Sequence, residues 1–129
     1  MKKIKVSILT VLLAGCGGES TNESPEEFAK KGVVENEWVF ISDSSVQCGY
    51  EGESPEETQK LLLEAGIDVL ESTCGHRTEA VPAVCGGVTT QINLHSIRTE
   101  NVIDANNLGF TSVSDLENSI DDGYLIVDC

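Results

Sequence analysis

The sequence predicts a small α+β domain in which a four-stranded antiparallel sheet carries two helices on one face. Two observations predict this class. The chain has 129 residues, which fits one small domain. Helical and strand-like segments also alternate in the order β-α-β-β-α-β, and two right-handed crossovers would place both helices on the same face of the sheet. Another small α+β fold, with a mixed sheet of different strand order, is the main alternative.

The domain is expected to span residues 37–129 and to begin with a strand. Residues 38–42 are aromatic and β-branched, as strands prefer. After a loop at 43–53, Ser54 is suited to cap a helix and Pro55 to occupy its first position. The expected apolar face of this helix, and the glycine that ends it, are Leu61, Leu62, Ala65 and Gly66.

The second half of the domain supplies three more strands and one more helix. Residues 67–73 and 88–97 are expected to be strands, joined by a loop that contains Pro82. A helix is expected from Thr99 to Leu108, followed by an irregular stretch and a last strand at 124–127. This order is the ferredoxin-like pattern.

The strand at 88–97 alternates between apolar and polar residues. Ile92 and Leu94 are expected to point toward the helices, and Gln91, Asn93 and His95 toward the other face. Such a polar row is the best-defined candidate binding face in the domain. A solvated sheet surface without a ligand is the alternative.

Composition excludes two classes of protein. The formal net charge is −14, with 22 acidic and 8 basic residues, whereas a protein that binds nucleic acid through phosphates needs clustered Lys and Arg. We therefore expect no nucleic-acid partner. Hydrophobic residues make up 40% of the chain, which is too many for a disordered protein.

The N-terminus has the features of an export signal. Lysines at positions 2, 3 and 5 precede an apolar run that is too short to cross a bilayer, since a spanning helix needs about 20 residues. The run ends in Leu13-Ala14-Gly15-Cys16, an aliphatic residue, two small residues and a cysteine. This motif resembles the lipobox of bacterial lipoproteins.

The resemblance implies that residues 1–15 are a signal peptide and that Cys16 is the lipidated residue. In that family a diacylglyceryl group is added to the thiol, a peptidase cuts before the cysteine, and the new amino group is often acylated, for example with palmitate. Gly17 stands where Asp would favour inner-membrane retention, so the outer membrane is expected if the source is Gram-negative. Residues 16–36 are polar and would form a flexible tether to the membrane.

The other four cysteines are Cys48, Cys74, Cys85 and Cys129. An even number in an exported chain favours two disulfides. Cys74 and Cys85 flank the connection between two expected neighbouring strands, so Cys74–Cys85 with Cys48–Cys129 is the preferred pairing. Cys48–Cys85 with Cys74–Cys129 remains open, because the simple topology separates Cys48 from Cys129.

These features favour a lipid-anchored envelope protein whose disulfide-bonded domain binds another envelope component. One alternative is a metal-binding envelope protein that uses Cys74, His76 and Cys85, with His95 as a further ligand. A second alternative is a small envelope enzyme, although His76 and His95 are the only near-neutral bases and no catalytic motif is present. We expect no cofactor.

Overall fold

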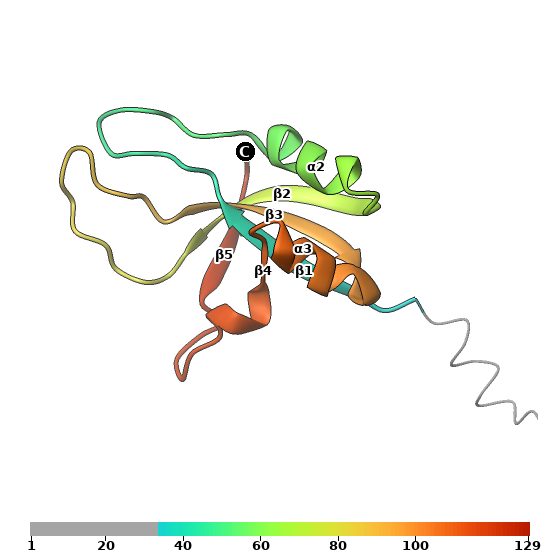
Figure 1. Cartoon of the computed structure of the whole chain (residues 1–129). Helices are drawn as coiled ribbons and strands as arrows, with labels where there is room; N and C mark the ends of the chain where they lie inside the picture. The colour runs from blue at the N-terminus through green and yellow to red at the C-terminus, as the bar shows by residue number, and fades with distance from the viewer. Residues whose placement is uncertain (1–33) are drawn as a thin grey trace, which may run out of the picture. The chain divides into compact units, whose positions relative to one another are not determined.

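The computed structural model describes residues 34–129, which form a five-stranded antiparallel sheet with two α-helices (Figure 1). Its strands lie in the order β4-β1-β3-β2-β5. The predicted signal peptide, Cys16 and the tether up to residue 33 lie outside the described residues. The elements are β1 (Asn36–Ser42), α2 (Pro55–Glu64), β2 (Val69–Arg77), β3 (Gln91–Arg98), the 3-10 turn η2 (Thr99–Asn101), α3 (Val102–Asn107), β4 (Thr111–Ser112), the 3-10 turn η3 (Val113–Leu116) and β5 (Tyr124–Val127).

The predicted α+β class is confirmed, but the prediction of four strands is wrong. The irregular stretch after α3 contains the two-residue strand β4, which pairs with β1. The predicted last strand is β5, and it pairs with the last four residues of β2. Because β4 and β5 lie at opposite edges of the sheet, η3 and the loop after it carry the chain from one edge to the other.

The strands β2 and β3 also differ from their predicted bounds. β2 begins two residues later than predicted and continues past Thr73 to Arg77. This extension is paired on both sides, with β3 and with β5, and the two partners keep it extended. β3 begins at Gln91 rather than Val88, which makes only an isolated bridge to Val46.

Helix α2 begins and ends as its sequence indicates. The Ser54 side chain accepts a hydrogen bond from the backbone of Glu57, whose carboxylate accepts one from the backbone of Ser54. Gly66 follows the helix with a φ of 80°, in the left-handed region that glycine adopts without strain. On the apolar face Leu62 is fully buried, whereas Leu61 is 43% exposed, so the predicted buried face was too wide.

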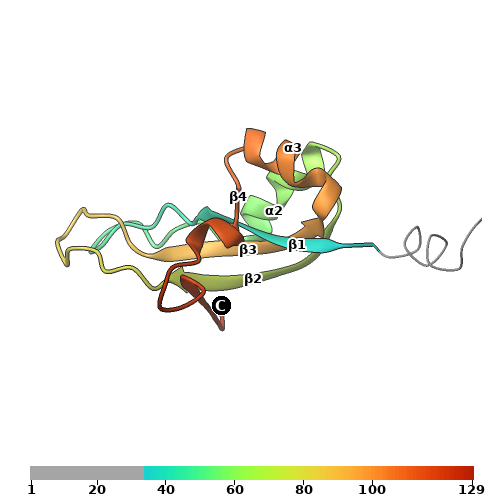
Figure 2. The ribbon, with the colours of Figure 1, turned by 90° about the horizontal axis from the view of Figure 1, so that it is seen from below.

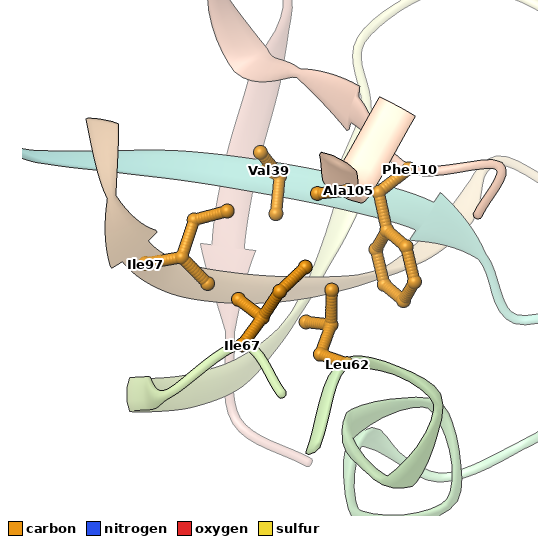
Figure 3. Close-up of a cluster of buried hydrophobic side chains, with 6 residues drawn as sticks. All are labelled: Val39, Leu62, Ile67, Ile97, Ala105 and Phe110. Carbon is orange, nitrogen blue, oxygen red and sulfur yellow. The ribbon is translucent and has the colours of Figure 1, made fainter. Parts of the chain in front are cut away.

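Both helices cover the same face of the sheet, as Figure 2 shows. Leu62 of α2 and Ala105 of α3 belong to one cluster of buried side chains with residues of β1 and β3 (Figure 3). Ile67 lies between α2 and β2 and enters this cluster as a buried turn residue rather than as part of the predicted strand. The full cluster is Val39, Leu62, Ile67, Ile97, Ala105 and Phe110.

The opposite face of β3 is buried as well. Ile92 and Leu94 are 2% and 0% exposed, and Leu94 is the register partner of Phe40 in β1. In β2, the other neighbour of β3, a Cβ atom at Gly75 would lie 2.6 Å from Leu94 Cδ1 and 2.8 Å from the backbone oxygen of Leu125. The absent side chain of Gly75 is therefore what lets Leu94 and β5 pack closely against β2.

Adjacent leucines of α2 provide a test of this packing. Leu62→Ala should lower the free energy of unfolding by about 2–5 kcal/mol, because it removes a fully buried side chain and leaves a cavity. Leu63→Ala is the matched control, since Leu63 is 48% exposed and its truncation should cost less than about 1 kcal/mol. Urea denaturation with the disulfides intact measures both values. Equal losses for the two variants would show that the helix faces the sheet with a different side.

Candidate functional site

The predicted binding row on β3 is not an exposed face. Gln91 is exposed, but Asn93 is 2% and His95 0% exposed. Both lie on the helix-covered side of the strand, so the predicted faces of β3 were reversed. The expected exposure of Asn93 and His95 is therefore wrong, whereas Gln91 is exposed and, together with Asn93, lines a pocket. A binding role for this row stays a prediction.

Asn93 and His95 are accommodated under the helices because each finds a polar partner there. The Asn93 side-chain amide donates to the backbone oxygen of Glu53 at 2.8 Å, just before α2. His95 Nε2 lies 2.9 Å from Thr58 Oγ1 of α2, and Nδ1 lies 2.7 Å from Ser72 Oγ of β2. These bonds replace the hydrogen bonds to water that the amide and the imidazole lose when they are buried.

Hydroxyl groups contact both ring nitrogens of His95. The Ser72 hydroxyl beside Nδ1 also donates to Gln59 Oε1 at 3.2 Å. The Thr58 hydroxyl beside Nε2 also donates to the backbone oxygen of Pro55 at 3.3 Å. Phe110 meets the ring edge-on, with 5.7 Å between the ring centroids. Burial among these groups lowers the pKa of His95 to about 4, and the carboxylate of Glu56 opposes that shift only in part. His95 is thus a neutral structural residue at pH 7.

One sequence signal could have predicted the second buried face. Residues 38–41 of β1 form a continuous apolar run without alternation, as in strands that are covered on both sides. β1 pairs with β3 along its whole length, and its residues Trp38, Phe40 and Ile41 are half-buried. In β3, Ile92 and Leu94 are buried on the face away from the helices, while Asn93 and His95 bond to the Glu53 carbonyl and to the hydroxyls of Thr58 and Ser72.

The prediction of two disulfides is confirmed, but the preferred pairing is wrong. The bonds are Cys48–Cys85 and Cys74–Cys129, which is the pairing that was left open. Cys74 lies inside β2 rather than in the following loop, and β5 runs beside it, with Val127 as the register partner of Cys74. Cys85 remains in the long loop, where it lies beside the loop that contains Cys48.

This pairing also contradicts the predicted metal site. Cys74 and Cys85 belong to different disulfides, so neither offers a thiolate. His95 is enclosed by Thr58 and Ser72. Within residues 34–129 no three side chains of His, Cys, Asp or Glu gather closely enough to hold a metal ion.

An acidic pocket of about 490 Å³ opens beside the start of α2. The Cys74–Cys129 disulfide and His76 form part of its wall. Four carboxylates also line it, those of Asp43, Glu51, Glu53 and Asp128. Of these, Asp43 is already engaged, because its Oδ1 accepts hydrogen bonds from the backbone and the hydroxyl of Ser45. The pocket gives this end of the domain a negative potential.

The most unusual surface is the outer edge of the sheet at β5, which the sequence reasoning did not single out. Within the described residues 34–129, β5 is paired only with β2. Its residues Leu125, Ile126 and Val127 are 54%, 58% and 38% exposed. Edge strands of soluble proteins usually carry charges or proline that prevent further pairing, and β5 has neither. The signal in the sequence is four consecutive apolar residues without alternation, between Gly123 and Asp128.

Comparison of the chain with protein-family models, with curated proteins and with solved structures found no match. None of the helices described in residues 34–129 has the length and apolar character needed to cross a membrane. The surfaces of the domain itself therefore carry the functional argument.

The buried histidine makes stability depend on pH. The pKa of His95 is about 4 in the folded state, against about 6.5 in an unfolded chain, so the unfolded chain takes up the proton first as the pH falls. The stabilisation is complete above pH 6.5 and is lost progressively down to about pH 4, by about 2–3 kcal/mol.

His95→Gln, which retains hydrogen-bonding groups but does not titrate, should remove this contribution. Chemical denaturation of both proteins at pH 7, 5.5 and 4 measures the free energy of unfolding. The difference between the two proteins isolates the contribution of His95, because both contain the same carboxylates. Parallel stability curves for the two proteins would mean that His95 is accessible to water or already charged.

Proposed function

We propose that this protein is a lipid-anchored component of a bacterial cell envelope whose acidic, disulfide-bonded domain binds another envelope protein. The lipid would be attached to the Cys16 thiol, and the chain would then be cleaved between Gly15 and Cys16, as the Leu13-Ala14-Gly15-Cys16 motif implies. Two disulfides in a domain of this size fit an oxidising compartment outside the cytoplasm. With Gly17 after the cysteine, the outer membrane is the proposed location in a Gram-negative source.

The physical chemistry of the anchor supports a permanent attachment. One acyl chain alone binds a membrane only marginally, whereas two or three chains on one residue hold it stably. The domain itself carries 18 acidic and three basic residues between Val34 and Cys129. This charge keeps a tethered domain in solution and away from anionic lipid headgroups.

A single observation carries the proposal of partner binding, namely the free apolar edge of β5. Three consecutive exposed aliphatic side chains on an unpaired edge offer both backbone hydrogen-bonding groups and apolar surface to another chain. Addition of a strand to such an edge is a common mode of peptide recognition. The opposite edge is less suited to this role, because β4 there is only two residues long and is followed directly by η3.

Cys16→Ser tests the anchor. The variant should lack lipid and should remain uncleaved, because the thiol that receives the diacylglyceryl group is gone. Ser20→Ala, in the same polar stretch, should be processed and lipidated normally. Intact-mass spectrometry of the membrane fraction reads both changes. A mature chain that begins elsewhere than Cys16, or begins there without added lipid mass, would contradict the anchor.

A photoreactive amino acid placed at Leu125 tests the binding edge in living cells. One discrete crosslinked species is expected, and it should disappear when Ile126→Lys is added to the same chain. The matched control is the same photoreactive residue at Ile103 of α3, which is 73% exposed and distant in the topology from β5. The captured protein, identified by mass spectrometry and purified, should then bind the unmodified chain directly. Equal crosslinking from both positions would refute a specific edge.

A further inference from the structure

We propose, on the basis of the function above, that the β5 edge binds an extended segment of its partner that carries basic side chains about six residues apart, with uncharged residues between them. The segment would add to the sheet as a further antiparallel strand.

The backbone of β5 determines the mode of binding. Every neighbouring pair of strands in the sheet is antiparallel, and β5 continues that pattern, with no strand of the described part of the chain paired to its outer side. β2 extends beyond β5, from Val69 to Thr73, where β5 no longer covers it. An added strand therefore has about four residues of ladder along β5.

The exposed side chains determine what lies between the basic residues. Val127 shares a face with its register partner Cys74, and Leu125 lies on that same face, two residues away. Ile126 points to the opposite face, with its partner Gly75. Because the strand is exposed on both faces, the bound segment gains contact area on both sides only if its central residues carry no charge.

The charges around β5 determine the ends of the segment. Asp121 and Asp122 precede the strand and Asp128 follows it, and all three are exposed. No lysine, arginine or histidine occurs from residue 99 to residue 129. Arg77, opposite Tyr124 in β2, already forms an ion pair with Glu79. Asp122 and Asp128 are six positions apart in the sequence, and the four residues of β5 that lie between them are extended, so two basic groups at about that spacing in an added strand would lie near both ends.

Asp121, which directly precedes Asp122, is held in position by a hydrogen-bonded turn. Asp121 Oδ1 accepts from the Asn118 amide at 2.8 Å, from the Thr78 hydroxyl at 3.0 Å and from the backbone N–H of Gly123 at 2.7 Å. These bonds lower the pKa of Asp121, so its charge persists in mildly acidic solution. The negative end of the edge is thus a fixed feature next to the strand.

The same charges disfavour two other occupants. A symmetric antiparallel pair of β5 strands centred on Leu125 would place Asp122 of one copy opposite Asp128 of the other, and like charges in such pairs are destabilising. An anionic lipid surface would be repelled for the same reason. A basic extended segment is the occupant for which backbone, apolar and electrostatic complementarity agree.

The experiment uses the full chain in detergent micelles and two labelled seven-residue peptides. One peptide has lysine at both ends with alternating valine and threonine between them, and the other has glutamate at both ends. Fluorescence anisotropy at low salt should give at least tenfold tighter binding for the lysine peptide, with the preference falling as salt is added. Amide hydrogen exchange should slow at residues 124–127 when that peptide is bound.

Matched variants separate charge from strand pairing. The double variant Asp122→Lys, Asp128→Lys should reverse the preference and favour the glutamate peptide. The control Glu100→Lys, Asp104→Lys makes the same change of net charge on η2 and α3 and should leave the preference in place. Ile126→Lys, which puts a charge in the middle of the edge, should weaken binding of the lysine peptide.

The outcomes that would overturn the inference differ from those that would overturn the proposed function. Equal binding of both peptides, or reversal by the control variant, overturns the basic segment. Self-association of the chain that Ile126→Lys abolishes overturns it in favour of a second copy. If neither peptide binds while the crosslink at Leu125 holds in cells, the segment is wrong and the function stands. Loss of that crosslink as well removes the function.

Discussion

The whole structure depends on the burial of β3 on both faces. The strand lies in the middle of the sheet, with β1 and β2 along its two sides, and it carries the largest share of buried residues of any strand. Ile97 contributes to the core beneath the helices, while Leu94 packs on the opposite side against Gly75. His95 is acceptable at this depth only because Thr58 and Ser72 complete its hydrogen bonds. The position of α2 over the sheet is therefore fixed by a polar contact as well as by Leu62.

The two disulfides reinforce regions that this core does not reach. Cys48–Cys85 joins two long loops beyond the end of the sheet, and Cys74–Cys129 joins β5 to β2. A domain of this size buries a modest apolar area, and covalent links commonly supplement such cores. The Cys74–Cys129 bond has a second effect, since it holds an exposed apolar strand in place while its outer edge stays open. The proposed binding edge is therefore tied covalently to β2 just beyond its C-terminal end.

Local signals predicted the elements well, and long-range packing limited the rest. Ser54, Pro55 and Gly66 predicted α2 because caps and stops act within a few residues. Strand alternation identified β3 but assigned its faces wrongly, because a period of two does not say which face meets the helices when both are buried. The disulfide pairing failed for a related reason, since it required knowing that residues 124–127 return to β2. The expected exposure of Asn93 and His95 was wrong for the same reason, and the β5 edge was missed because exposure of a strand depends on its place in the sheet. Cys16 and its motif lie outside the described residues and remain a prediction from the sequence.

The disulfide connectivity has a consequence for the way this chain folds. The native bonds link cysteines 37 and 55 positions apart, whereas Cys74 and Cys85 are separated by only eleven. A short loop closes at a lower entropic cost, so in an unfolded chain Cys74 meets Cys85 more often than it meets Cys129. Early oxidation therefore favours a non-native Cys74–Cys85 bond, which must be exchanged before Cys74 can be linked to Cys129. Pairing of β5 with β2 is also distant in sequence and hence slow. Maturation of this domain should accordingly be limited by thiol–disulfide exchange and benefit from a compartment that catalyses it.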